Sequence, residues 1–190
     1  MKKLFIVLLV LSLRGDMFNG FLYGQDSKFE KYSRTVTHRI GESFGGGIVF
    51  FVYGRGEHGL IAALEDQDKG LRWFGGINVT TGDGVGSGLK NTDIILGYKG
   101  VPPDVTFAAK LCKEYSVKID GVKYDDWYLP SKLELSLLYI RRNLVGGFSY
   151  NYYWTSTIYK NDVTWFQDFG NGRQDINISM PNAVRAIRAF

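Results

Sequence analysis

The sequence DWYLPSKLE, residues 126–134, joins the end of a strand to the start of a helix. Pro130 disfavours helical geometry in the residue before it, so the preceding segment should stop there. Ser131 is a preferred helix N-cap, and Glu134 follows three residues later, which completes a capping-box pattern. We therefore expect a helix that begins at Ser131 and ends at Gly146, where glycine can terminate it.

Four strand-like runs follow this helix, each rich in β-branched and aromatic residues. They cover residues 152–159, 163–169, 173–179 and 184–190. Arg185 and Arg188 lie three residues apart in the last run, so they should point to opposite faces. We expect at least one of them to bind buried carbonyls or a carboxylate.

The segments before the helix predict a hairpin, a loop region and a second helix. Residues 48–53 and 58–64 are apolar runs separated by a turn at 54–57, which is typical of a hairpin. Residues 65–101 are rich in glycine and irregular. Trp73 and Phe74 are expected to pack this region against the core. A helix should begin at about residue 102 and run to about residue 115, with Cys112 on its apolar face.

Together these elements predict an α+β fold with antiparallel sheets, two packed helices and a long irregular glycine-rich loop region. The hydrophobic content of 45% is sufficient for a core without metals or disulfides. Cys112 is the only cysteine, so no intrachain disulfide is expected.

The first residues have the pattern of a secretory signal. Lys2 and Lys3 precede an unbroken apolar run at 4–13, which is too short to span a bilayer. We expect a signal peptide over 1–24, a polar lead-in over 25–43 and a folded domain over 44–190. A retained membrane anchor is the alternative, and we expect no integral membrane segment after cleavage.

The charge balance argues against a nucleic-acid partner. The net charge of the whole chain is +4. Removing residues 1–24 takes away three basic residues and one acidic residue, which leaves +2. Such a weak basic bias is not typical of nucleic-acid binding.

Several short motifs resemble the Lcl C-terminal-like domain family, named for the C-terminal region of a collagen-like bacterial adhesin. The matching segments are GGIVF at 46–50, HGLIAA at 58–63, KNT at 90–92, AAKLC at 108–112, DWYLPS at 126–131, YWTST at 153–157 and VRAIR at 184–188. Their order and spacing, rather than any one motif, carry the resemblance, which covers roughly residues 44–190.

The resemblance implies a variant of the C-type-lectin-like fold in an exported and often adhesive bacterial protein. The member that gives the family its name is associated with sulfated glycosaminoglycans. The chain carries no collagen-like repeat, so a trimerising stalk is not implied. The small basic excess also weakens the expectation of a polyanionic ligand.

The residues that usually carry catalysis are sparse. There are two histidines, and no G-x-S-x-G elbow is present. A phosphate-binding loop requires a lysine directly after its last glycine, and the glycine-rich run at 82–90 has none at that position. Related sulfatase-modifying enzymes rely on paired cysteines, whereas Cys112 is alone. We therefore expect no catalytic residue and no enzyme activity.

Aromatic residues are the better candidates for ligand binding, because sugar rings stack on exposed tryptophan or tyrosine while polar neighbours bind the hydroxyls. Trp127 and Trp154 are expected in the core. The predicted ligand-binding residues are Trp73, Tyr153, Trp165, Gln167, Asn171 and Arg173.

No cofactor or metal is expected, although calcium stays open as an alternative. Glu65, Asp66 and Asp68 offer carboxylates on one loop, which calcium prefers. The calcium-lectin signatures Glu-Pro-Asn and Trp-Asn-Asp are absent from the sequence. Solvated loop acids are the simpler interpretation.

The sequence thus predicts an exported, non-catalytic binding module that is secreted, periplasmic or on the outer surface. Its expected partner is an extracellular glycan or a surface protein. The alternative is a structural or protein–protein interaction module of the cell envelope with no sugar site. The sequence leaves the ligand and the oligomeric state open.

Overall fold

The computed structural model describes residues 36–73, 76–100, 104–149, 151–160, 163–177 and 180–190. Within it, Val36–Phe190 form a compact unit. The expected signal peptide and residues 25–35 of the expected lead-in lie outside the described residues. Residues 36–43 belong to the compact unit, because Gly41 N–H donates to the Val49 carbonyl and His38 N–H to the Gly56 carbonyl, both at 2.8 Å.

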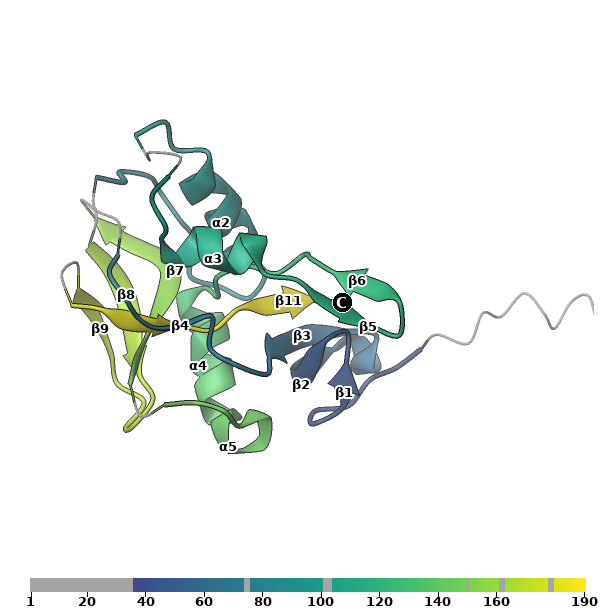
Figure 1. Cartoon of the computed structure of the whole chain (residues 1–190). Helices are drawn as coiled ribbons and strands as arrows, with labels where there is room; N and C mark the ends of the chain where they lie inside the picture. Colours follow the sequence, from purple (N-terminus) through teal and green to yellow (C-terminus); the bar gives the residue numbers. More distant parts are fainter. Residues whose placement is uncertain (1–35, 74–75, 101–103, 150, 161–162, 178–179) are drawn as a thin grey trace, which may run out of the picture. The chain divides into compact units, whose positions relative to one another are not determined.

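The fold is α+β, as predicted, with four α-helices in the described part and several sheets (Figure 1). The strands are β1 (Ser43–Phe44), β2 (Gly47–Tyr53), β3 (His58–Ala63), β4 (Asp68–Leu71), β5 (Val117–Ile119), β6 (Val122–Tyr124), β7 (Tyr152–Lys160), β8 (Val163–Asp168), β9 (Gln174–Asn177), β10 (Asn182–Val184) and β11 (Ile187–Ala189). The helices are α2 (Ser87–Leu96), α3 (Ala108–Glu114), α4 (Lys132–Ile140) and α5 (Arg142–Val145), with a short 3₁₀ turn η1 (Gly54–Gly56).

Two larger sheets and a separate hairpin make up the β structure. One sheet has the order β1-β2-β3-β11 and contains the predicted hairpin of β2 and β3. The other has the order β4-β10-β7-β8-β9. Its pair β10–β7 is parallel, whereas its other pairs are antiparallel, so the expectation of purely antiparallel sheets was wrong at this one pair.

The predicted final strand at 184–190 was wrong, because the structure divides this segment between the two sheets. β10 lies between β4 and β7, and β11 pairs with β3. The chain changes sheets at Arg185 and Ala186. The Ala186 carbonyl accepts a hydrogen bond from Ala63 N–H at 3.0 Å. The N–H of Ala186 donates to the Gln67 side chain.

The expected count of two packed helices was also too low. α3 and α4 correspond to the predicted helices, although α3 begins at Ala108 and residues 101–103 lie outside the described residues. The capping box of α4 is confirmed, since Ser131 Oγ accepts from Glu134 N–H and the Glu134 carboxylate accepts from Ser131 N–H. The segment then ends at Gly146, whose φ is 75°.

Helix α2 lies in the region predicted as an irregular loop. Its buried positions are Gly88, Asn91, Thr92 and Ile95, so its inner face is mostly small or polar. Asn91 binds the backbone of Gly82 through both amide atoms, and Thr92 Oγ1 accepts from Leu129 N–H at 3.1 Å. The apolar period that normally marks a helix is absent because hydrogen bonds replace apolar contacts on this face.

The core consists of two groups of buried side chains. The first contains Trp73, Trp127 and Trp154, and the second is built around Tyr153 and Phe169. Trp127 and Trp154 are fully buried, as the sequence predicted. Successive residues Tyr153 and Trp154 of β7 belong to different groups, because alternate side chains of a strand point to opposite faces of its sheet.

Candidate functional site

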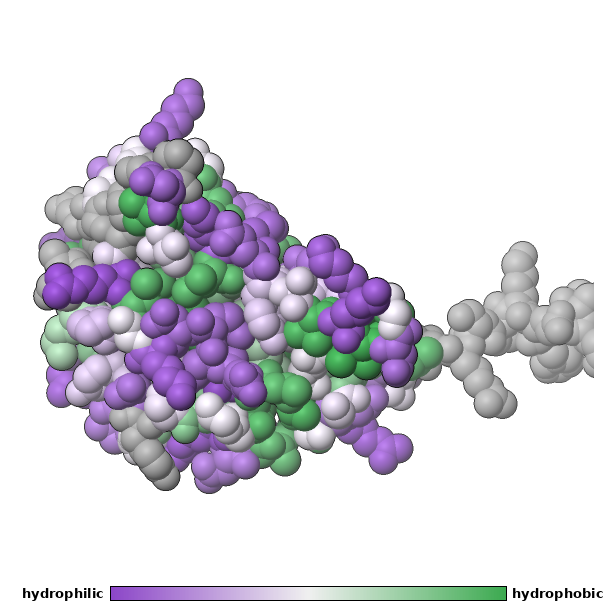
Figure 2. Space-filling view, viewed as in Figure 1, coloured by the Kyte–Doolittle hydropathy of each residue, from purple (hydrophilic) through white to green (hydrophobic). Residues whose placement is uncertain are grey.

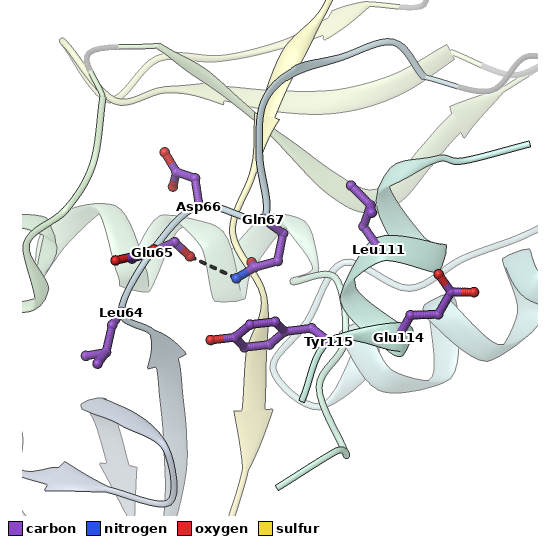
Figure 3. Close-up of a pocket in the computed structure, with 7 residues that line it drawn as sticks. All are labelled: Leu64, Glu65, Asp66, Gln67, Leu111, Glu114 and Tyr115. Atoms are coloured by element: carbon purple, nitrogen blue, oxygen red, sulfur yellow. Dashed lines mark hydrogen bonds between the residues drawn. The ribbon is translucent and has the colours of Figure 1, made fainter. Parts of the chain in front are cut away.

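A groove of ≈ 510 Å³ lies between the loop after β3 and the end of α3 (Figure 3). Its volume falls in the range of small-molecule sites. The residues that line it are Leu64, Glu65, Asp66, Gln67, Leu111, Glu114 and Tyr115.

A buried ion pair anchors the loop side of the groove. Arg185 Nε donates to Asp66 Oδ1 at 2.7 Å, and both side chains are almost completely buried. Tyr153 Oη donates to the other oxygen of Asp66 at 2.9 Å. Arg185 also donates to the Ala63 carbonyl at 2.9 Å and the Gly147 carbonyl at 2.6 Å. The carboxylate of Asp66 is therefore neutralised inside the protein and is not free for a ligand.

Gln67 is held in one orientation by three hydrogen bonds. Its Nε2 donates to the Glu65 carbonyl at 2.8 Å, and its Oε1 accepts from Ala186 N–H. Its backbone N–H donates to the Val184 carbonyl at 2.8 Å. The loop that carries Glu65 is thus fixed to the segment where the chain passes between the two sheets.

Tyr115 supplies an aromatic ring to the groove. Its side chain is half-buried and extends from the end of α3 toward Glu65 (Figure 3). The edge-to-face contact with Trp127, at 5.1 Å between ring centroids, fixes the ring on the core side. Burial raises the pKa of the Tyr115 hydroxyl, and the negative charge of Glu65 raises it further, while Arg185 opposes them.

The two remaining carboxylates of the groove are exposed. In Figure 3, Glu65 lies toward the hydroxyl end of Tyr115, whereas Glu114 projects from α3 with its carboxylate pointing away from the ring. Neither makes an ion pair with any residue that the structure describes. The groove thus combines a ring, apolar surface from Leu64 and Leu111, and hydrogen-bond acceptors, the mixture that a small polar ligand with an apolar face requires.

Three of the predicted ligand-binding residues are buried instead. Trp73 is 4% exposed and lies against Trp154, with ring centroids 5.6 Å apart. Tyr153 is 0% exposed, and Gln167 is 1% exposed and donates to the Gly172 carbonyl. Their surfaces are covered by the protein itself, so the prediction that these side chains present themselves to a ligand is corrected.

The other three predicted residues lie together on the β8–β9 hairpin. Trp165 is partly exposed, but Lys132 Nζ lies 3.4 Å from the centroid of its ring. Asn171 and Arg173 are exposed in the connecting turn. Asn171 Oδ1 accepts from Arg173 N–H, and the Arg173 guanidinium pairs with Asp175 at 2.7 Å. These three side chains do not line the groove between the β3–β4 loop and α3.

The sequence did not predict a ligand site at the residues that line the groove. Glu65 and Asp66 were named only as weak candidates for calcium. Tyr115 has no sequence signal that separates it from a core tyrosine at a helix end. The groove exists only because the fold brings segments 64–67 and 111–115 together. A half-exposed ring beside acidic residues could be recognised only after that folding.

The possible calcium site does not form in the described residues. No group of three His, Cys, Asp or Glu side chains there is arranged to hold a metal ion. Asp66 is paired with Arg185, and Asp68 Oδ1 accepts from Gly70 N–H at 2.7 Å. The absence of a required metal stays a prediction, with calcium dependence as its alternative.

No family model matches the chain, and no curated protein matches its sequence. The family resemblance of the short motifs therefore stays a prediction. Among the described residues, no helix has both the length and the apolar character needed to cross a membrane.

The buried phenol of Tyr153 predicts a loss of stability at alkaline pH. Burial raises its pKa to about 12 from an ordinary value of 10.0. The neutral phenol therefore stabilises the fold fully below pH 10, and this contribution disappears as the pH rises to 12. Relative to Tyr153→Phe, the wild-type protein should lose at most about 2 kcal/mol of unfolding free energy across that interval, because solvent near the hydroxyl screens part of the effect.

Urea denaturation of both proteins at several pH values would measure this difference. Near-ultraviolet absorbance of the folded proteins would follow the phenol directly. A difference between the two proteins that stays constant across the interval would contradict the assignment.

Proposed function

We propose that this chain is an exported, non-catalytic binding module that recognises a glycan in the groove between the β3–β4 loop and α3. The partly exposed ring of Tyr115, set among polar groups in a groove of ≈ 510 Å³, is the observation that carries the proposal. The C-type-lectin-like fold and the bacterial surface location belong to the same proposal, and the α+β architecture is compatible with them.

The chemistry of the groove suits a sugar. A pyranose has one apolar face that packs on an aromatic ring, and hydroxyls at its edge that donate hydrogen bonds. Tyr115 offers the ring, and the exposed carboxylates of Glu65 and Glu114 in the lining offer acceptors. Hydrogen bonds to a charged group are the stronger kind, so these acceptors would contribute to orientation as well as affinity.

Support for a binding role also comes from how the groove is held. Asp66, Gln67 and Tyr115 are fixed by contacts with Arg185, Ala186 and Trp127, respectively. A ligand would therefore meet a preformed surface and would not have to order these groups. Preformed sites lose less entropy on binding than mobile ones.

Replacing Tyr115 with leucine should remove the aromatic ring on which a sugar stacks, while the leucine side chain keeps most of the apolar volume. We expect glycan binding to weaken at least tenfold, since stacking of a sugar on an aromatic ring is the main apolar contact available (about 1.4 kcal/mol per tenfold change). A glycan array followed by titration calorimetry would measure it, with and without calcium.

Tyr159→Leu is the matched control, because Tyr159 is an exposed tyrosine on β7 outside the groove. It should bind as the wild type does. Equal loss in both variants would place the ligand elsewhere, and release of reducing sugar from any bound glycan would contradict the non-catalytic role.

A protein-interaction module is the second candidate, and the β5–β6 hairpin favours it. Ile119 and Val122 are 47% and 52% exposed, and Figure 2 shows apolar side chains among charged ones over this hairpin. A second pocket of ≈ 250 Å³ lies beside it, lined in part by Phe44, Leu64 and Tyr124. Failure to bind any glycan would favour this candidate.

A further inference from the structure

We infer that the groove selects glycans with unsubstituted amino groups and disfavours sulfated or carboxylated ones. The inference rests on the proposed function and specifies its ligand class. It concerns the charge that the groove presents locally, which differs in sign from the net charge of the chain.

The residues that line the groove are acidic rather than basic. Of its seven lining residues, Glu65, Asp66 and Glu114 are acidic and none is basic. Asp66 is neutralised by Arg185. The nearest basic residue along α3, Lys113, is paired with Asp93 of α2 at 3.1 Å. Two exposed carboxylates without ion pairs among the described residues are left to face a ligand.

The field of the Glu65 carboxylate reaches the surface where a sugar would stack. The negative charge of Glu65 contributes to the raised pKa of the Tyr115 hydroxyl, second to burial, and exceeds the opposing effect of the Arg185 charge. A group bound against this ring therefore lies within the influence of the Glu65 carboxylate. A cationic group there is attracted and an anionic group is repelled.

Of the two, Glu65 is the one placed beside the ring. In Figure 3 it lies toward the hydroxyl end of Tyr115, whereas the Glu114 carboxylate projects from α3 and points away from the ring. A protonated amino group at the hydroxyl end of the ring would therefore come close to Glu65. A sulfate in the same place would meet a like charge with no lysine or arginine in the lining to neutralise it.

The net charge of +4 over the whole chain is too weak a basic bias to set a preference for polyanions. Local charge decides because exposed charges more than about 8 Å apart are largely screened at physiological ionic strength. Basic residues elsewhere on the surface would therefore contribute little at the groove.

The test compares three ligands of equal length by titration calorimetry: glucosamine oligosaccharides with free amines, their N-acetylated counterparts, and heparin oligosaccharides. The wild-type protein should bind the free amines tightest and heparin weakest. The Glu65→Gln/Glu114→Gln double variant should bind the free amines about five- to tenfold more weakly, as the loss of two partly exposed ion pairs predicts. Its affinity for the N-acetylated ligand should change less than about twofold.

Glu57→Gln is the matched control, because Glu57 is exposed and does not line the groove. It should behave as the wild type with all three ligands. The charge selection would be overturned if the wild-type protein bound free-amine and N-acetylated sugars equally well. If Tyr115→Leu still abolished that binding, the proposed glycan site would stand. Tightest binding of heparin would also overturn it. Absence of binding to all three ligands and to the glycan array would instead remove the proposed function itself.

Discussion

Replacing Arg185 with methionine is expected to lower the free energy of unfolding by about 3–5 kcal/mol. The substitution removes the only ion-pair partner that the described residues give to Asp66, whose carboxylate is buried. It also leaves the carbonyls of Ala63 and Gly147 without the donor that now reaches them. A buried charge and buried carbonyls without partners are among the costliest defects that a single substitution creates.

Arg188→Met is the natural comparison, since Arg188 pairs with the exposed carboxylate of Asp126 at 2.6 Å. An ion pair with one exposed member should contribute only about 0–1 kcal/mol. Urea denaturation of both variants measures the difference. Adding Asp66→Asn to Arg185→Met should recover part of the loss, because it removes the unpaired charge. Similar losses for the two arginine variants would contradict the assigned role of Arg185.

Replacing Trp154 with alanine should also cost about 3–5 kcal/mol. Its side chain is fully buried in the first core group and contacts Trp73. Its Nε1 donates to the Leu71 carbonyl at 2.7 Å, which connects β7 to β4 across β10. The alanine variant would thus lose apolar burial and a hydrogen bond at once.

Trp165→Ala provides the contrast within the same sheet. Trp165 is partly exposed on β8, and its ring contacts the Lys132 ammonium group. Exposed cation–π contacts contribute about 0.5–1 kcal/mol, so this variant should be much less affected. Thermal unfolding followed by circular dichroism would rank the two variants. A larger loss for Trp165→Ala would contradict the division of tryptophans between core and surface.

The elements that could be predicted from the sequence are those with local physical signals. The capping box of Ser131 and Glu134 needs only residues within one helical turn, so the start of α4 was correct. The β2–β3 hairpin was equally local. Helix α2 could not be predicted in the same way, because its buried Asn91 and Thr92 bind backbone atoms of residues far along the chain or outside the helix.

The candidate site was less predictable than the fold. Stacking residues were sought among tryptophans, but Trp73 contributes to the core instead. Tyr115 gained its place in the groove from the approach of α3 to the β3–β4 loop. The loop itself is held by the pairs Arg185–Asp66 and Ala186–Gln67, each of which joins residues 119 positions apart in the sequence. No short pattern encodes such distant pairings.

The division of the final segment between two sheets couples the folding of both sheets. β10 lies inside one sheet, and β11 pairs with β3 at the edge of the other. Only Arg185 and Ala186 separate these two strands, so a defect at this crossing disturbs both sheets at once. The two sheets should therefore unfold together in one cooperative transition.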